Sequence, residues 1–130
     1  MGVPIDLSEI DVDSYVVAGI ADHITPWQNC YRTTQLFGGN SRFVLSTSGH
    51  IAALVNPPGN PKASFYSGKE TPARATDWLD NAESNKGSWW NDLSQWLDER
   101  TGARRAAPIA LGTPSHPVLA AAPGTYVFDS

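Results

Sequence analysis

The distribution of apolar and polar residues along the first half of the chain predicts a β-α-β unit. Residues 14–21 form a mostly apolar run rich in β-branched and aromatic types, which is typical of a strand buried on both faces. Residues 42–47 form a second run of this kind. A helix-crossover connection joins strands of the same direction and is right-handed, so we expect these two strands to be parallel.

Residues with helical spacing lie between the two predicted strands: Trp27, Cys30, Tyr31, Thr34 and Phe37. The predicted helix has boundary signals at both ends. Thr25 stands at the N-cap position with Pro26 in the first turn, and Gln28 completes a T-x-x-Q capping box. The pair Gly38-Gly39 predicts the C-terminal end. The sequence therefore predicts one continuous helix ending near these glycines.

Loops and two further short helices are predicted for the rest of the chain. Residues 56–70 are rich in proline and are interpreted as a long loop. The first helix starts at Thr71-Pro72, with Ala75, Trp78, Leu79 and Ala82 on one side. The second begins at Ser88 and ends at Gly102, and one stripe along it is made of Trp89, Leu93, Trp96, Leu97 and Arg100. From residue 103 onward we expect coil, with a final extended segment at 126–128.

Two parallel strands make a poor sheet by themselves, because parallel sheets normally contain several strands and are covered on both faces. No other segment has the apolar run of such a strand. We therefore interpret residues 1–102 as the C-terminal β-α-β-α portion of a larger doubly wound α/β domain that is incomplete on its own. Residues 103–130 are interpreted as an Ala/Pro-rich tail, docked at 123–128.

Composition and charge exclude several classes of protein. The 130 residues are 41% hydrophobic and 17% charged, which is ordinary for a globular domain. Nine Lys and Arg against thirteen Asp and Glu give a net charge of −4, which argues against a nucleic-acid partner. No apolar run approaches the ~20 residues of a membrane span, and no basic signal region precedes one. We expect a cytoplasmic protein.

Two polar residues follow the predicted parallel strands and are the strongest candidates for chemistry. Asp22 comes directly after the first strand and His50 soon after the second. Ligand sites of open α/β sheets lie beyond the carboxyl ends of the strands, where these side chains would meet. A carboxylate bound to one imidazole nitrogen leaves the other nitrogen free to act as a general base. The spacing alone leaves two interpretations open: a catalytic pair, or two polar loop residues.

A nucleophile for such a pair is absent from the sequence. In α/β-hydrolases the order Asp then His follows an earlier nucleophile in a G-x-S-x-G-like turn, and neither Gly-x-Ser-x-Gly nor Gly-x-Cys-x-Gly occurs here. The single cysteine, Cys30, lies in the middle of the predicted helix, where free cysteines usually serve as small apolar packing groups. We therefore expect Cys30 to be structural and the nucleophile to lie outside this sequence.

Several motifs resemble the C-terminal part of the polyhydroxyalkanoate synthases, the family that includes poly-3-hydroxybutyrate synthases. They occur in the family's order over nearly the whole chain, at residues 21–27, 41–45, 48–58, 87–90 and 122–127, and the resemblance is weakest at 103–120. It implies an α/β-hydrolase-type domain of an acyltransferase that polymerises (R)-3-hydroxyacyl-CoA thioesters into storage polyester. The acyl-CoA is then a substrate, and no cofactor is expected.

The resemblance also implies residue roles. Asp22 of the Asp-His-Ile motif would be the triad acid and His50 of the Gly-His-Ile motif the triad base. The family's cysteine nucleophile stands in an upstream segment that this sequence does not contain, so we expect the chain to be inactive alone and to need another polypeptide that supplies the rest of the sheet. His23 is a candidate neighbour of the substrate, although a structural or solvated histidine is the simpler interpretation. The histidines lack metal-ligand spacing, so no metal is expected.

Three functions remain open at this stage. The first is the synthase fragment just described, located in the cytoplasm or at polyester granules. The second is a non-catalytic module that binds a synthase or a granule surface through the tryptophan-rich segment 78–96. The third is a hydrolase or depolymerase fragment of the same fold, because the same Asp–His pair serves synthesis and hydrolysis.

Overall fold

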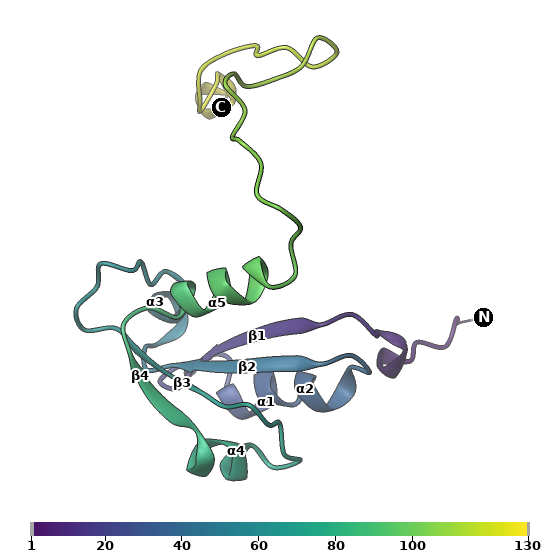
Figure 1. The fold of residues 1–130 in the computed structure, drawn as a ribbon, viewed down its shortest axis with the longest axis vertical. Helices are drawn as coiled ribbons and strands as arrows, with labels where there is room; N and C mark the ends of the chain where they lie inside the picture. The colour runs from purple at the N-terminus through teal and green to yellow at the C-terminus, as the bar shows by residue number, and fades with distance from the viewer. Residues whose placement is uncertain (1, 130) are drawn as a thin grey trace. The chain divides into compact units, whose positions relative to one another are not determined.

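The computed structural model describes residues 2–129 and contains a four-stranded mixed sheet in the order β1-β2-β3-β4 (Figure 1). The first two strands are parallel, and the other two neighbouring pairs are antiparallel. The strands are β1 (Ser14–Gly19), β2 (Ser41–Ser46), β3 (Ser64–Ser67) and β4 (Glu83–Lys86). The predicted parallel pair is therefore confirmed, with Ser14 opposite Ser41 and Gly19 opposite Ser46.

The expectation of only two strands is wrong. β3 lies inside the segment predicted to be a loop, and β4 lies between the two predicted helices. β3 has only two apolar residues, Phe65 and Tyr66, and β4 has none. Both strands exist because the ladder of backbone hydrogen bonds extends outward from β2, and such pairing needs no hydrophobic pattern in the added strand.

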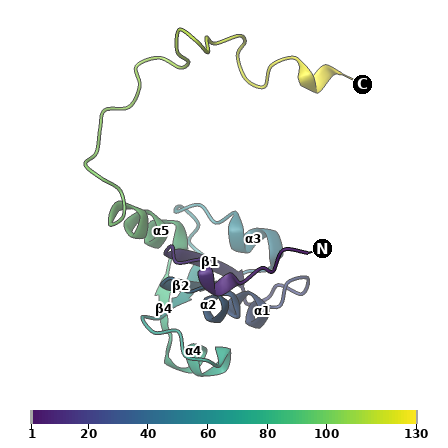
Figure 2. The same cartoon turned by 90° about the vertical axis from the view of Figure 1, so that its right-hand side faces the viewer.

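Helices cover both faces of the sheet (Figures 1 and 2). On one face lie α1 (Trp27–Tyr31), α2 (Thr33–Leu36) and α4 (Ala75–Asn81). On the other lie α3 (His50–Leu54) and α5 (Trp89–Asp98). α5 has the predicted Ser88 cap, whose side chain accepts from the Trp90 amide, while Leu97 of its predicted apolar stripe is exposed. α3 had no counterpart in the sequence-based prediction.

The helix predicted between β1 and β2 is broken into α1 and α2. The Thr34 hydroxyl donates to the Tyr31 carbonyl oxygen at 2.8 Å and so competes with the regular helix hydrogen bonds. The predicted capping box is also wrong, because Pro26 is the N-cap residue and has no side-chain cap. α2 ends at Leu36, two residues before Gly38.

Two aromatic clusters form the core, one on each face of the sheet. On the face of α1 and α4, Phe43 of β2 contacts Tyr31 and Trp78 edge-to-face, at ring-centroid distances of 5.0 and 4.7 Å. On the opposite face, Trp89 packs with Val44 and Phe65. The prediction that Trp78 and Trp89 cover the sheet is confirmed, and Trp96 lies half-buried against Tyr15. The two central strands are thus covered on both faces.

The chain divides into two units, one ending at Arg100 and one beginning at Thr101. Two short 3-10 helices lie near the ends of the chain, η1 (Leu7–Glu9) and η2 (Tyr126–Phe128). The latter replaces the extended segment predicted at 126–128. The docking of 123–128 on the first unit stays a prediction. Within residues 2–129, no helix has the length and apolarity to cross a bilayer.

Candidate functional site

The carboxyl ends of the two parallel strands bring Asp22 and His50 together. Asp22 follows β1 after a turn, and His50 is the first residue of α3, which follows β2. His50 Nδ1 lies 2.8 Å from Asp22 Oδ2. The Asp22 side chain is only 6% exposed, whereas that of His50 is 43% exposed. The second imidazole nitrogen, Nε2, does not contact the carboxylate and belongs to the more exposed of the two side chains.

Asp22 is held by three further donors in its own loop. Its Oδ1 accepts from the amides of Ile24 at 2.9 Å and Thr25 at 3.0 Å, and its Oδ2 accepts from the Thr25 hydroxyl. The Thr25 hydroxyl is the main cause that lowers the pKa of Asp22 below its usual range, followed by the Thr25 amide, His50 and the Ile24 amide. Asp22 is therefore a carboxylate at neutral pH. Thr25, predicted as a helix cap, instead orients this carboxylate.

Gly19 lets α3 approach the end of β1 closely. A Cβ at this position would lie 2.6 Å from the Ser48 carbonyl oxygen and 2.9 Å from the Ala53 Cβ. Neither distance is compatible with a side chain, so only glycine allows the loop before α3 and the helix itself to pack here. The first residue of α3, His50, is thereby kept next to the loop that carries Asp22.

The other two candidate residues named from the sequence do not take part in the hydrogen bond between Asp22 and His50. His23 is exposed in the loop after β1, and its role beside a substrate stays a prediction. Cys30 is partly buried in α1, and burial, followed by the negative charge of Asp22, raises the pKa of its thiol. A raised thiol pKa leaves little thiolate at neutral pH, which is the opposite of what a nucleophile requires.

We expect Cys30 to react slowly with a thiolate-selective reagent in the folded chain. Labelling with iodoacetamide at neutral pH, followed by mass spectrometry, should proceed at least about 10-fold faster in urea than in buffer, because unfolding removes the burial that raises the pKa. Equal rates in the two conditions would show that Cys30 is not protected by the fold.

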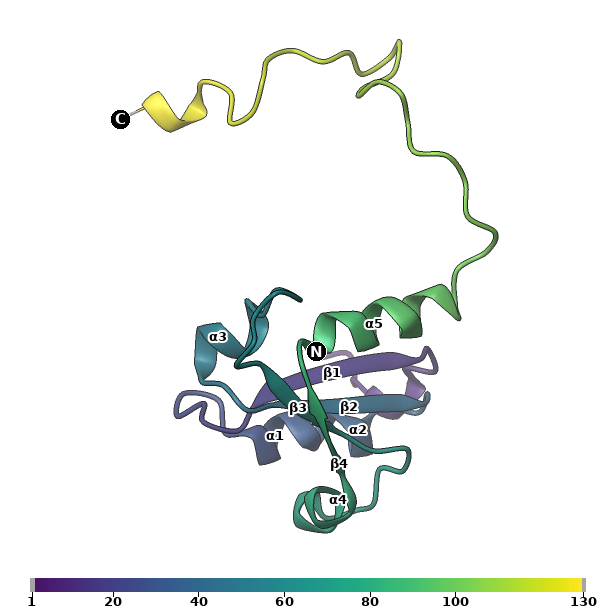
Figure 3. The same ribbon diagram turned by 60° about the vertical axis from the view of Figure 1, so that its left-hand side comes forward.

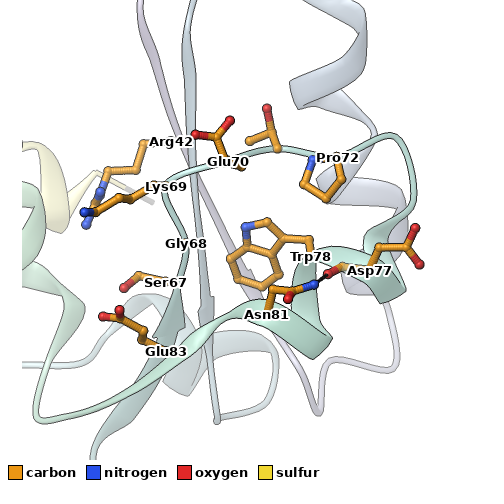
Figure 4. Close-up of a pocket in the computed structure, with 11 residues that line it drawn as sticks. Arg42, Ser67, Gly68, Lys69, Glu70, Pro72, Asp77, Trp78, Asn81 and Glu83 are labelled. Carbon is orange, nitrogen blue, oxygen red and sulfur yellow. Dashed lines mark hydrogen bonds between the residues drawn. The ribbon is translucent and has the colours of Figure 1, made fainter.

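A cavity of about 800 Å³ lies at the other end of the sheet, near the start of β2 (Figure 4). Arg42, Lys69 and Trp78 are among its lining residues, and neither Asp22 nor His50 belongs to the lining. Among residues 2–129, no three His, Cys, Asp or Glu side chains are grouped to hold a metal ion. The Asp22–His50 pair, at the carboxyl ends of β1 and β2, is therefore the candidate functional site.

Comparisons with known proteins connect this chain to one family. No protein-family model matches the chain. The chain is 49% identical over 128 residues to poly(3-hydroxyalkanoate) polymerase 1 of Ectopseudomonas oleovorans, and the match covers 98% of this chain and 23% of that protein. It is 43% identical over 126 residues to the poly(3-hydroxyalkanoate) polymerase subunit PhaC of Cupriavidus necator, covering 97% and 21%. The corresponding subunit of Rhizobium etli is 34% identical over 128 residues, covering 98% and 20%.

The resemblance deduced from the motifs is confirmed by these relatives. The chain belongs to the poly(3-hydroxyalkanoate) polymerase family and spans between a fifth and a quarter of the length of the curated relatives it matches.

Proposed function

We propose that this chain is the C-terminal segment of a polyhydroxyalkanoate synthase and supplies the base and its carboxylate partner to the acyltransfer site. The reaction would polymerise (R)-3-hydroxyacyl-CoA thioesters. The observation that carries the proposal is the hydrogen bond between His50 Nδ1 and Asp22 Oδ2 at the carboxyl ends of two parallel strands. The choice of reaction is supported by the 49% identity to a polymerase over 98% of this chain.

The pair can perform the proton transfers of acyl transfer. Asp22 accepts a hydrogen bond from the Nδ1–H group of His50, which keeps the proton on Nδ1 and leaves Nε2 unprotonated and able to take a proton from a cysteine thiol. The thiolate attacks the thioester carbonyl, the C–S bond to CoA breaks, and the imidazolium returns its proton to the departing CoA thiolate. In the next step Nε2 takes the proton of a 3-hydroxyl group. That oxygen attacks the acyl-enzyme, an ester bond forms, and the cysteine leaves as thiolate.

The nucleophile in this proposal lies on polypeptide outside these 130 residues. No Gly-x-Cys-x-Gly or Gly-x-Ser-x-Gly turn occurs in the sequence, and Cys30 has a raised pKa. Large apolar side chains beside the pair are exposed, namely Ile24, Ile51, Leu54 and Val55. Such a surface is typical of an interface that other polypeptide covers. The need for that polypeptide is part of the proposal.

The same apolar surface favours one second candidate function. A non-catalytic module could bind a polymerase through these residues without using His50 for chemistry. The two functions differ in one testable respect: only the first requires the imidazole of His50.

The deciding experiment replaces the matched segment of one of the relatives with this chain, giving a hybrid polymerase. We expect the hybrid polymerase to release CoA from (R)-3-hydroxybutyryl-CoA, and the isolated chain to release none. His50→Ala should lower turnover of the hybrid by at least about 10³-fold, because the general base and its coupling to the nucleophile are lost together.

The matched control is His116→Ala, which removes an exposed histidine from the second unit and should leave turnover unchanged. Full activity of the His50→Ala hybrid would favour the association module. A folded hybrid that releases no CoA would refute the acyltransfer proposal.

A further inference from the structure

We propose that Ser88, Trp89 and Trp90 are positioning residues that clamp the C-terminal end of α3 and so hold His50 against Asp22. This inference rests on the proposed function for the role of His50. It assigns a task to the Gly87-Ser-Trp-Trp90 motif, which from the sequence was known only as part of the family resemblance and of the tryptophan-rich segment.

α3 needs contacts from other parts of the chain to hold His50 in a fixed position. It has five residues, His50–Leu54, and helices of this length are not stable by themselves. Its last carbonyl groups have no partners within the helix and must find donors elsewhere. Because His50 is the first residue of α3, a rotation or tilt of the helix would move the imidazole away from Asp22.

Three side-chain donors at the start of α5 meet this need. Trp89 Nε1 donates to the Ala53 carbonyl oxygen at 2.7 Å, and Trp90 Nε1 donates to that of Leu54 at 3.0 Å. The Ser88 hydroxyl donates to the carbonyl oxygen of Asn56, just beyond the helix. Figure 3 shows the start of α5 beside α3. We define these three residues as the α3 clamp.

The clamp is itself fixed to the sheet. Trp89 is only 7% exposed and packs against Val44 of β2 and Phe65 of β3. Ser88 is buried and its Oγ accepts from the Trp90 amide at 3.0 Å, so its hydroxyl both caps α5 and contacts the α3 side. Gly87, with a φ of +94°, makes the turn from β4 into α5 in a conformation that other residues rarely adopt.

α3 is therefore held from two directions. Gly19 allows it to sit directly on the end of β1, and the clamp binds the carbonyl end of the helix, at the opposite end from His50. Most buried indole N–H groups in proteins have an acceptor, so one such bond alone would be ordinary packing. Here both neighbouring indoles donate to consecutive carbonyls of one short helix, which fixes its orientation as well as its position.

The test uses Trp89→Phe and Trp90→Phe, which keep an aromatic ring and remove the N–H donor. In the hybrid polymerase, Trp89→Phe should lower kcat by about 10–100-fold and change KM by less than about 2-fold, because a displaced base affects the chemical step more than substrate binding. In the 130-residue chain, the proton resonance of His50 Nδ1–H should weaken or disappear. Trp90→Phe should show both effects in the same direction and to a smaller extent, since Trp90 is only partly buried.

Trp96→Phe is the matched control, because Trp96 lies on the same helix and packs on Tyr15 and Arg100. It should change neither kcat nor the His50 resonance. The inference is overturned if Trp89→Phe and Trp90→Phe both leave the Nδ1–H resonance and kcat as in the unsubstituted chain. A hybrid that is inactive before any substitution refutes the proposed function alone, since the resonance measures the positioning of His50 independently of turnover.

Discussion

Replacing Asp22 with asparagine should lower the turnover of the hybrid polymerase by about 10⁴-fold, the size of effect seen when the carboxylate of a Ser-His-Asp site is made neutral. The amide has nearly the same shape, so the loop hydrogen bonds from Ile24 and Thr25 to Oδ1 can persist. The partner of His50 Nδ1 would lose its charge, and the imidazole would no longer be held in the tautomer that leaves Nε2 unprotonated. The measurement is CoA release under substrate saturation.

Asp80→Asn is the matched control, because it makes the same chemical change at an exposed position of α4. Its turnover should equal that of the unsubstituted hybrid. Because the pKa of Asp22 lies below its usual range, the carboxylate stays ionised through mildly acidic pH, and a loss of turnover there has another cause. A hybrid with Asp22→Asn that retains more than about a tenth of the turnover would contradict the role assigned to this carboxylate.

Phe43→Ala should be the most destabilising single substitution in the sheet, costing about 3–5 kcal/mol of the free energy of unfolding. Phe43 has 0% exposure and contacts Trp27, Tyr31 and Trp78, so its removal leaves a cavity among rigid aromatic rings that cannot collapse to fill it. The sheet has four strands, and its two central strands are covered on both faces, which exceeds the minimum for independent stability. Urea unfolding of the 130-residue chain is therefore the appropriate measurement.

Ile5→Ala provides the comparison, since Ile5 belongs to the first unit and is 86% exposed. We expect it to change the free energy of unfolding by less than about 0.5 kcal/mol. Similar effects of the two substitutions would mean that the aromatic cluster around Phe43 does not form the core.

The parallel strands could be predicted because their signal is carried by side chains. Val16 and Ala18 of β1 and Phe43 and Leu45 of β2 face one aromatic cluster, while Val17 and Val44 face the other. A strand buried on both faces has to be apolar throughout, and that pattern is visible in a single sequence. α5 was predicted for the same reason, with its boundary marked by Ser88.

β3 and β4 could not be predicted because their signal is carried by the backbone. The register places Phe65 opposite Asn85 and Tyr66 opposite Ser84, so β4 supplies polar partners to a strand whose apolar residues pack elsewhere. α3 was missed since its position depends on Gly19 and the clamp, which lie far from it in the sequence. Long-range hydrogen bonds of this kind leave no local periodicity to detect.

The position of the candidate site could be predicted from the sequence, but the residues that orient Asp22 and His50 could not. The rule that ligands bind beyond the carboxyl ends of parallel strands is sufficient to pair Asp22 with His50. The contribution of Thr25 was misassigned to a helix cap, because a T-P-x-Q pattern satisfies the capping rule whatever the threonine contacts. The indole donors of Trp89 and Trp90 have no sequence signal beyond the hydrophobic character of tryptophan.

The two borders of the sheet differ in a way that affects how further strands can join it. β4 forms one border and carries only polar and charged side chains, with Glu83 and Lys86 at its ends. Charged side chains on an edge strand disfavour pairing with a strand of another polypeptide. β1 forms the other border and is mostly apolar, without a charge or proline. The features that hinder pairing with a further strand are therefore present at β4 and absent from β1, the border strand that leads to Asp22.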